Sequence, residues 1–207
     1  MNQKTVEVET RFHFKNVNEA YEMIPFLKES LSSTNHWETH HFGLELFEKD
    51  QILRVGKNIR NNNEPQFYLG WKGPDHGKLV NIREEIDEEI TSGIKDSAIL
   101  ALLGGTSSLA TAESVTDEIN RLDYHLFMSF SGHNKLGYYE PDGLHLKLMQ
   151  CPILEWPILV EIEKTAQDLD EAFKLEGEIL EITGKLQLKD RLVRKEPPTL
   201  LFETLQK

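Results

Sequence analysis

Residues 6–14 read Val-Glu-Val-Glu-Thr-Arg-Phe-His-Phe, a strict alternation of two kinds of side chain. Side chains two residues apart share one face of a β-strand. As a strand, this segment presents Glu7, Glu9, Arg11 and His13 on one face, and an ordinary strand turns such a polar face to water. If the face is enclosed, the carboxylates could hold a divalent cation and the guanidinium could hold an anion.

The same arrangement of acids and bases returns along the chain, most clearly in residues 81–89 and 158–164. Enclosing these charges is costly, because buried charges need partners. Carboxylates on one wall would hold a hard divalent cation, and basic residues would hold an anion that bridges to it. Oxygen ligands suit Mg²⁺ or Mn²⁺, and no Cys or paired-His set indicates structural zinc. The charged side chains expected on these faces are Glu7, Glu9, Arg11, Arg54, Lys72, Arg83, Glu85, Asp87, Arg121, Lys147, Glu161 and Glu163.

Composition excludes several classes of protein. A chain of 207 residues is long enough for one large domain or two small ones. Its single cysteine, Cys151, excludes an intrachain disulfide framework and is typical of a reducing compartment. No apolar run approaches the ~20 residues that span a bilayer, so we expect a cytoplasmic protein without membrane contact. The net charge of −12 argues against an extended nucleic-acid partner but allows a small phosphorylated ligand.

The periodicity predicts an α+β fold with more strands than helices. Hairpin-length loops favour an antiparallel sheet with helices on its apolar side, and closing it into a barrel turns the polar faces inward. We expect strands at 6–14, 36–47, 51–57, 67–72, 81–90, 120–130, 144–149 and 158–164, helices at 18–33 (with Pro25 inside), 96–103 and 168–183, a loop at 58–65, and loop or weak strand at 107–116.

Five motifs in order resemble those of the CYTH family, the triphosphate tunnel metalloenzymes. They are Glu7-x-Glu9-x-Arg11, Leu53-Arg54, Trp71-Lys72-Gly73-Pro74, Arg83-Glu84-Glu85-Ile86-Asp87 and Glu161-Ile162-Glu163. The resemblance covers about residues 6–184 and implies one domain over residues 1–207. It implies a closed or nearly closed eight-stranded antiparallel tunnel that binds triphosphate. Activities in this family include hydrolysis of inorganic or thiamine triphosphate, RNA triphosphatase action, and cyclisation of ATP by class IV adenylyl cyclases.

The resemblance also implies roles for individual residues. Metal ligands for Mg²⁺ or Mn²⁺ would be Glu7, Glu9, Glu161 and Glu163. Phosphate oxygens would be bound by Arg11, Arg54, Lys72, Arg83, Arg121 and Lys147. Glu85 and Arg11 would be the catalytic residues, and Glu85, together with Asp87, would complete the acidic set or orient water.

The sequence departs from the family pattern at several positions. Arg11 stands where most members have Lys, and Gly56 stands where a second basic residue is expected. Ile119 replaces a common Lys, and Gln150 or Cys151 stands where an Asp usually precedes the late pair of acids. The tail reads Lys195-Glu196-Pro197-Pro198 instead of a Ser-Tyr pair. Fewer cations imply weaker triphosphate binding or a different anion.

Three functions remain open at this point. The first is a metal-dependent phosphohydrolase of inorganic triphosphate or a small organic triphosphate. The second is a class IV-like adenylyl cyclase that converts ATP to cyclic AMP and pyrophosphate. The third is a non-catalytic binder of phosphorylated ligands. The organic part of the substrate, the preferred metal and the oligomeric state are not readable, although a homodimer is possible if the tunnel leaves a sheet edge open.

Overall fold

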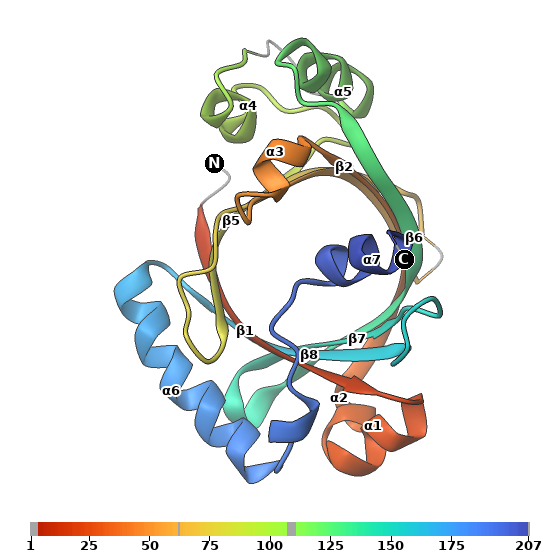
Figure 1. Ribbon diagram of the computed structural model, residues 1–207, viewed down its shortest axis with the longest axis vertical. Coiled ribbons are helices and arrows are strands. Elements are labelled where there is room, and N and C mark those ends of the chain that lie inside the picture. The colour runs from red at the N-terminus through yellow and green to blue at the C-terminus, as the bar shows by residue number, and fades with distance from the viewer. Residues whose placement is uncertain (1–3, 62, 107–110, 207) are drawn as a thin grey trace. The chain divides into compact units, whose positions relative to one another are not determined.

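The computed structural model describes residues 4–61, 63–106 and 111–206. Its strands are β1 (Thr5–Phe14), β2 (Leu31–Phe42), β3 (Ile52–Arg60), β4 (Gln66–Lys72), β5 (Asn81–Glu89), β6 (Leu126–Tyr139), β7 (Leu144–Gln150) and β8 (Ile158–Ala166) (Figure 1). Its α-helices are α1 (Val17–Met23), α2 (Leu27–Ser30), α3 (Leu44–Phe47), α4 (Ala98–Leu102), α5 (Ala112–Arg121), α6 (Leu169–Lys185) and α7 (Pro197–Leu205). Two 3₁₀ turns complete the elements, η1 (Glu140–Asp142) and η2 (Lys189–Arg191).

The eight strands form a closed barrel in the order β1-β5-β4-β3-β2-β6-β7-β8. Neighbouring strands pair antiparallel, and apolar clusters join them to the helices. The predicted α+β fold with an eight-stranded antiparallel barrel is therefore confirmed. No helix among the described residues is long and apolar enough to cross a membrane.

The chain divides into two compact units. Unit 1 contains Met1–Thr5, His36–Asp75 and Arg83–Ser131. Unit 2 contains Val6–Asn35, His76–Ile82 and Gly132–Lys207. The assignment of all 207 residues to one domain stays a prediction.

Unit 1 is built on the three neighbouring strands β3, β4 and β5. Alternate apolar residues of these strands pack against α4 and α5, among them Leu53, Leu69 and Ile86. The opposite face carries the charged residues. Cross-strand register aligns Ile52 with Lys72 and then Glu85, and it aligns Arg54 with Gly70 and then Asp87. Residues aligned in this way point to the same side of a sheet, so these two rows share one face.

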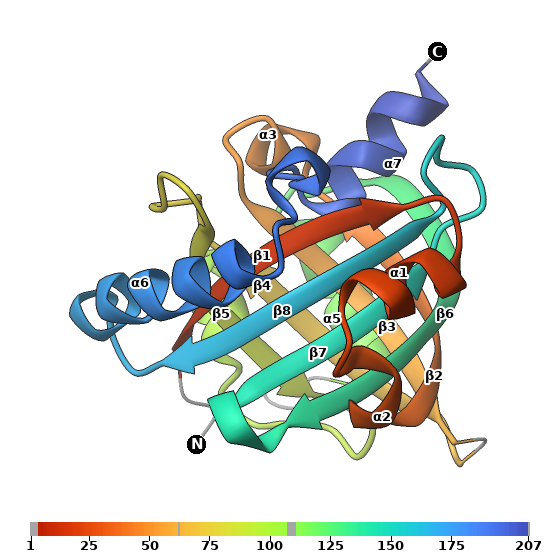
Figure 2. The same cartoon turned by 90° about the horizontal axis from the view of Figure 1, so that it is seen from below.

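Unit 2 contains β1, β8 and β7, which lie side by side in Figure 2. The helix α6 packs on β8 through an apolar cluster that includes Val8, Ala166 and Ile179. A second cluster joins α1 and α2 to the same side of the strands. Cross-strand register aligns Arg11 with Glu161 and Lys147, and it aligns Glu9 with Glu163 and His145, on the opposite face.

Two expected elements end early, and one helix is present that was not expected. The helix expected at 18–33 stops at Met23, close to Pro25, because the ring and the missing N–H of a proline break a helix. The short α2 follows, and residues 31–33 of the expected helix are the first residues of β2. The strand expected at 36–47 ends at Phe42, because Gly43 has φ +72° and the short α3 follows. The helix α7 was not expected.

The strand expected at residues 120–130 is wrong in its first part. A helix, α5, occupies Ala112–Arg121, and β6 begins only at Leu126. Thr111 and Ser114 form a capping box at the helix start, and Val115 and Ile119, four residues apart, are both fully buried. The prediction of loop or weak strand at 107–116 is wrong from Ala112 onward, and residues 107–110 lie outside the described part.

Candidate functional site

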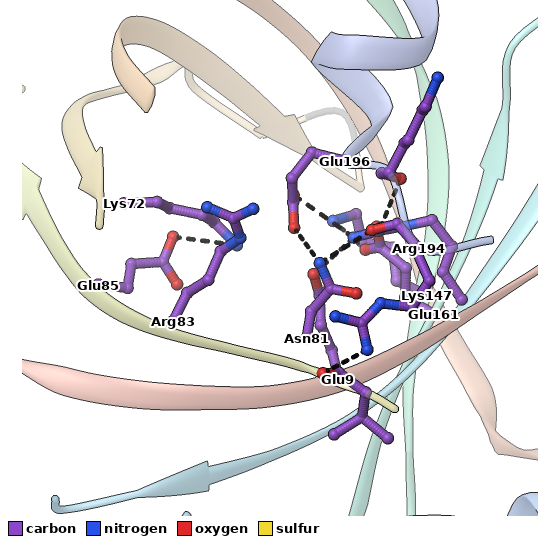
Figure 3. A network of polar contacts seen from close by, with 12 residues as sticks. Glu9, Lys72, Asn81, Arg83, Glu85, Lys147, Glu161, Arg194 and Glu196 are labelled. Carbon is purple, nitrogen blue, oxygen red and sulfur yellow. Dashed lines mark hydrogen bonds and ion pairs between the residues drawn. The ribbon is translucent and has the colours of Figure 1, made fainter. Parts of the chain in front are cut away.

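The charged face of unit 2 gathers around Arg11. Arg11 Nε donates to Glu161 Oε1 at 2.7 Å, and Arg11 Nη2 donates to Glu9 Oε1 at 2.5 Å. Nη2 also lies 3.4 Å from Glu196 Oε2. Lys147 Nζ is 2.5 Å from the other oxygen of Glu161. These five residues, called the acidic cluster below, come from β1, β7, β8 and the start of α7. Figure 3 labels Glu9, Lys147, Glu161 and Glu196 among them.

Burial makes the acidic cluster electrostatically tight. The side chains of Arg11, Glu9, Glu161 and Glu196 are at most 4% exposed. Burial alone lowers the pKa of Arg11, but the charges of Glu9, Glu196 and Glu161 outweigh it and hold the pKa well above its ordinary value. Burial raises the pKa of Glu161, but Lys147 and Arg11 outweigh it, and the pKa lies below its ordinary value. Arg11 is thus a permanent cation and Glu161 an anion.

Residues 192–196 form a strap, named here for its position along the end of β1. Leu192 makes an antiparallel bridge to Phe12, and Val193 N donates to Arg11 O at 2.8 Å. The carbonyl oxygen of Lys195 accepts from Arg11 Nη1 at 2.9 Å. The strap therefore brings the C-terminal part of the chain onto the guanidinium.

Asn81 links the strap to the first residues of β5. Its Nδ2 donates to the carbonyl oxygen of Arg194 at 3.0 Å and lies 3.4 Å from Glu196 Oε1. Arg194 Nη1 donates back to Val80 O at 2.8 Å. Glu196, Asn81 and Arg194 were not predicted as site residues. One signal was available for Glu196, because a proline in the first helical turn predicts a helix start, and that places Glu196 at the N-cap of α7.

The charged face of unit 1 gathers around Glu85 and is called the Arg54 cluster. Arg54 Nη2 donates to Glu85 Oε1 at 2.8 Å and to Asp87 Oδ1 at 3.3 Å. Lys72 Nζ lies 3.6 Å from the same oxygen of Glu85. Glu85 and Lys72 are each 8% exposed at the side chain, whereas Arg54 is 22% and Asp87 53% exposed. This cluster is therefore open to solvent on the side of Arg54 and Asp87.

Two glycines give Arg54 its room. A Cβ on Gly70 would lie 2.6 Å from Asp87 Oδ1 and 2.7 Å from Arg54 Nε, so the missing side chain lets Arg54 cross β4 to Asp87. A Cβ on Gly56 would lie 2.6 Å from the Tyr68 hydroxyl. The ring of Tyr68 lies 5.6 Å from the guanidinium carbon of Arg54, within cation–π range. Tyr68 thus fills the space where a second basic residue was expected.

Arg83 lies in unit 1 but binds a different set of atoms. Its Nη1 donates to the carbonyl oxygens of Asp50 and Gly73 at 2.8 Å each, and its Nη2 donates to Asp50 Oδ1 at 2.7 Å. Arg83 is 4% exposed. These bonds tie β5 to the loops at the ends of α3 and β4, which gives Arg83 a structural role in addition to any contact with a ligand.

The structure brings most of the expected residues into these two clusters. Glu163 lies opposite Glu9 in the register of unit 2, and Glu7 lies opposite Thr165 on the same face. Arg121 lies on no charged sheet face. It ends α5, is 62% exposed at the side chain, and pairs with Glu118 Oε1 at 2.6 Å. The expected strand position of Arg121 is wrong because the segment is helical.

The carboxylate oxygens of unit 2 have the chemistry that Mg²⁺ and Mn²⁺ prefer. However, Glu9 and Glu161, two of the four expected ligands, both bind Arg11. Within residues 4–61, 63–106 and 111–206, no group of three or more His, Cys, Asp or Glu side chains is placed to hold a metal ion. The arrangement shown therefore does not fit a divalent metal at Glu9 and Glu161 while Arg11 stays between them.

Comparison with known proteins gives likeness in structure only. No family model and no curated protein matches the sequence. The PH1819 protein of Pyrococcus horikoshii OT3 superposes with a TM-score of 0.70 at 18% identity, over 95% of this chain and 98% of that chain. A candidate adenylate cyclase from Vibrio parahaemolyticus superposes with a TM-score of 0.65 at 11% identity, over 97% and 99%. A chain of the Schizosaccharomyces pombe Mediator head module gives 0.56 at 12% identity, over 88% and 94%. At these identities the likeness shows that the chain shares the fold of these proteins, and no more.

Proposed function

We propose that the protein binds a triphosphate group and cleaves it by hydrolysis, with inorganic triphosphate or a small organic triphosphate as substrate. The observation that carries the proposal is that charged side chains of adjacent strands stand in register on one sheet face of each unit and are mostly buried. Arg11, Glu161 and Lys147 form such a row in unit 2, and Lys72 and Glu85 form another in unit 1. A solvated face does not bury its charges, and burying charges is costly even when they are paired, so we take their retention here as support for a binding site.

The Arg54 cluster supplies the groups for phosphate oxygens. Arg54 presents a planar fork that suits bidentate contact with phosphate, and it is the more exposed of the two cations. Lys72 adds a compact point charge beside it. Glu85 contacts both cations and fixes their positions. Positioning and charge neutralisation are the main requirements of phosphoryl transfer, so no covalent group is required of the protein.

A divalent ion, Mg²⁺ or Mn²⁺, is part of the proposal. We expect it to enter as the complex of the triphosphate, since Glu9 and Glu161 bind Arg11 in this structure. There it would neutralise charge on the phosphate oxygens. Glu163 stands opposite Glu9 with its carboxylate on the same sheet face, and Glu7 lies one pair further along.

Binding without turnover is the second candidate function. It is favoured by the pairing of the expected phosphate-binding residues, because Arg11, Arg54, Lys72 and Arg83 all contact carboxylates of the protein. A phosphate must displace or share those partners. Adenylyl cyclase action is the third outcome to be tested, and the fold shared with the Vibrio protein leaves it open.

The test measures products from tripolyphosphate, thiamine triphosphate and ATP with Mg²⁺ or Mn²⁺. Phosphate release supports hydrolysis, whereas cyclic AMP with pyrophosphate identifies a cyclase. Lys72→Met should lower kcat/KM by about 10²-fold, as loss of one fixed charge-stabilising group does elsewhere. Lys185→Ala is the matched control, because Lys185 is 71% exposed on α6 and pairs with Glu181. Binding of tripolyphosphate without turnover supports the second candidate, and absence of both binding and turnover would overturn the proposal.

A further inference from the structure

Two buried polar side chains of β2 have no hydrogen-bond partner among the described residues. They are the imidazole of His41, at both ring nitrogens, and the hydroxyl of Thr39. His41 is 1% exposed and Thr39 is 3% exposed. Leaving buried polar groups unpaired is costly, and native proteins rarely keep such groups without a reason. This pair of residues is therefore a candidate place for a bound partner.

His41 and Thr39 face the same side of the sheet as the Arg54 cluster. Phe42, next to His41, packs in the apolar cluster with α4 and α5, and so does Leu53, next to Arg54. Side chains alternate along a strand, so His41, Thr39 and Arg54 lie on the opposite face of the neighbouring strands β2 and β3. Burial, and after it the charge of Arg54, lowers the pKa of His41 to about 3, which leaves the imidazole neutral at pH 7.

Aromatic rings surround the imidazole of His41. Phe130 stacks on it with ring centroids 4.9 Å apart, and Trp37 meets Phe130 edge-on at 5.5 Å. Phe127 lies edge-on to His41 at 6.4 Å. Rings of this kind bind planar ligands by stacking. Phe127 and Phe130 are partly exposed, so they are the rings that can turn aside and admit a ligand to the buried nitrogens.

The polar atoms of this place define the chemistry of its ligand. A neutral imidazole has one donor and one acceptor, and a hydroxyl can act as either. A ligand that carries a donor beside an acceptor can therefore pair with His41 in either tautomer. A positively charged ring is disfavoured, because the charge of Arg54 acts at the same place.

We propose that Thr39, His41 and Phe130 form a binding site for an uncharged heteroaromatic ring that carries a hydrogen-bond donor beside an acceptor. Phe130 turns from His41 and stacks on the bound ring, and His41 and Thr39 pair with its polar edge. One step rests on the proposed function: because Arg54 lies on the same face, the ring is the organic group of the triphosphate, and inorganic triphosphate is the weaker ligand.

The first test uses two nucleosides without phosphate, so its result does not depend on the proposed function. Adenosine has an amino group beside a ring nitrogen, and purine riboside has the same ring system without the amino group. Adenosine should bind about tenfold more tightly, because purine riboside leaves a buried polar group unpaired. Nitrogen-15 NMR follows the imidazole signals of His41, which are identified by their loss in His41→Phe. Equal affinities, no binding of either nucleoside, or binding that leaves these signals unmoved would overturn the proposal.

Variants that keep the shape of the side chains test the two polar groups. His41→Phe and Thr39→Val should each weaken adenosine binding about tenfold. His40→Phe is the matched control and should bind adenosine as the wild type does, because His40 lies on the opposite face of β2, is 40% exposed and contacts Ser129 Oγ at 2.8 Å. Equal losses in His40→Phe and His41→Phe would contradict the site. If His41→Phe does not fold, Thr39→Val and the wild-type comparison of the two nucleosides still decide.

The second test separates the ring site from the proposed function. Calorimetry with Mg²⁺ compares ATP with tripolyphosphate, and His41→Phe should lower the affinity for ATP about tenfold more than that for tripolyphosphate. Equal losses for the two ligands would overturn the assignment of the ring to the substrate, while binding of tripolyphosphate would still support the proposed function. If neither triphosphate binds but adenosine moves the signals of His41, the proposed function fails and the ring site stands.

Discussion

The acidic cluster of unit 2 has three carboxylates and two cations, whereas the Arg54 cluster of unit 1 has two of each. In unit 2, one arginine is shared by three carboxylates, and its side chain is 1% exposed. In unit 1, one carboxylate, Glu85, is shared by two cations, and Arg54 is 22% exposed. An arginine closed in by acids is held in place, whereas an arginine at the solvent edge can exchange one partner for another.

The difference in burial indicates that Arg11 stabilises the fold, whereas Arg54 can exchange its partners for a ligand. Removing one member of a buried charge group leaves the others uncompensated, which is strongly destabilising. A partly exposed ion pair loses little, because water replaces the partner. We therefore expect unit 2 to respond to substitution mainly in stability and unit 1 mainly in ligand affinity.

The largest expected effect comes from Arg11→Ala. Loss of the guanidinium leaves Glu9, Glu161 and Glu196 facing each other, and should lower the free energy of unfolding by about 3–5 kcal/mol. Arg54→Ala should cost about 1 kcal/mol or less. Urea unfolding of both variants in metal-free buffer measures the difference. Equal losses would show that the two clusters do not differ in the way their burial indicates.

The next effect distinguishes two glycines of unit 1. Gly56→Ala should cost about 3 kcal/mol, the upper end of the cost of overpacking, because its Cβ would lie 2.5 Å from the backbone oxygen of Glu38. Gly70→Ala should cost less in stability, because the atoms nearest to its Cβ belong to the side chains of Asp87 and Arg54 and not to the backbone. It should instead shift Arg54 and weaken tripolyphosphate binding. Thermal unfolding and calorimetry separate the two results, and the reverse ranking would contradict this account of Arg54.

Strict alternation predicted that Glu9 and Arg11 share one face of a strand, and the structure bears this out. The roles of Glu161 and Lys147 came from the family resemblance, and the register that places Glu161 opposite Arg11 is known only from the structure. The sequence did not predict that Glu9 and Glu161 both form ion pairs with Arg11. This pairing depends on the rotamer that a buried guanidinium adopts and on the strap, and neither has a periodic signature.

The prediction of site residues outside the regular strands was weaker for the same reason. Glu196 reaches Arg11 from 185 positions along the chain, through a segment without alternation. The prediction for Arg121 was wrong for a related reason. Arg121, Asp123 and His125 alternate as in a strand, but Arg121 is the last residue of the capped helix α5. Local pattern was therefore sufficient for β1, β5 and β8 and insufficient where tertiary packing decides the element.

A buried histidine makes the stability of unit 1 depend on pH. His41 in unit 1 is 1% exposed, stacks on Phe130 at 4.9 Å, and has no hydrogen-bond partner on either ring nitrogen among the described residues. Burial, with the charges of Arg54 and His40, lowers its pKa to about 3. The unfolded chain binds this proton near pH 6.5, so stability falls as the pH drops from 6.5 toward 3.

His41→Phe should remove that loss, which amounts to about 2 kcal/mol between pH 7 and pH 5. Glu161 in unit 2 acts at lower pH, because its pKa is held below the ordinary 4.5 and its contribution is lost only as the pH falls below that value. Glu161→Gln should therefore leave the slope between pH 7 and pH 5 unchanged. Urea midpoints at pH 7, 6 and 5 compare the two variants, and a slope that His41→Phe does not reduce would assign the proton to another group.

The smallest expected effect comes from Arg121→Ala. This variant tests whether the binding surface of unit 1 includes α5 in addition to the strands of the Arg54 cluster. The pKa of Arg121 is raised by its hydrogen bond to Glu118 on the same helix, and the Arg121 side chain is 62% exposed, against 15% for Glu118. An ion pair three residues apart on a helix surface contributes a few tenths of a kcal/mol, so unfolding should change by less than about 0.5 kcal/mol. Because Arg121 is on α5 and not on the charged sheet face with Arg54 and Lys72, tripolyphosphate affinity should also stay the same. A tenfold loss of affinity with unchanged stability would return Arg121 to the binding residues and would show that the ligand extends beyond the strands of the Arg54 cluster.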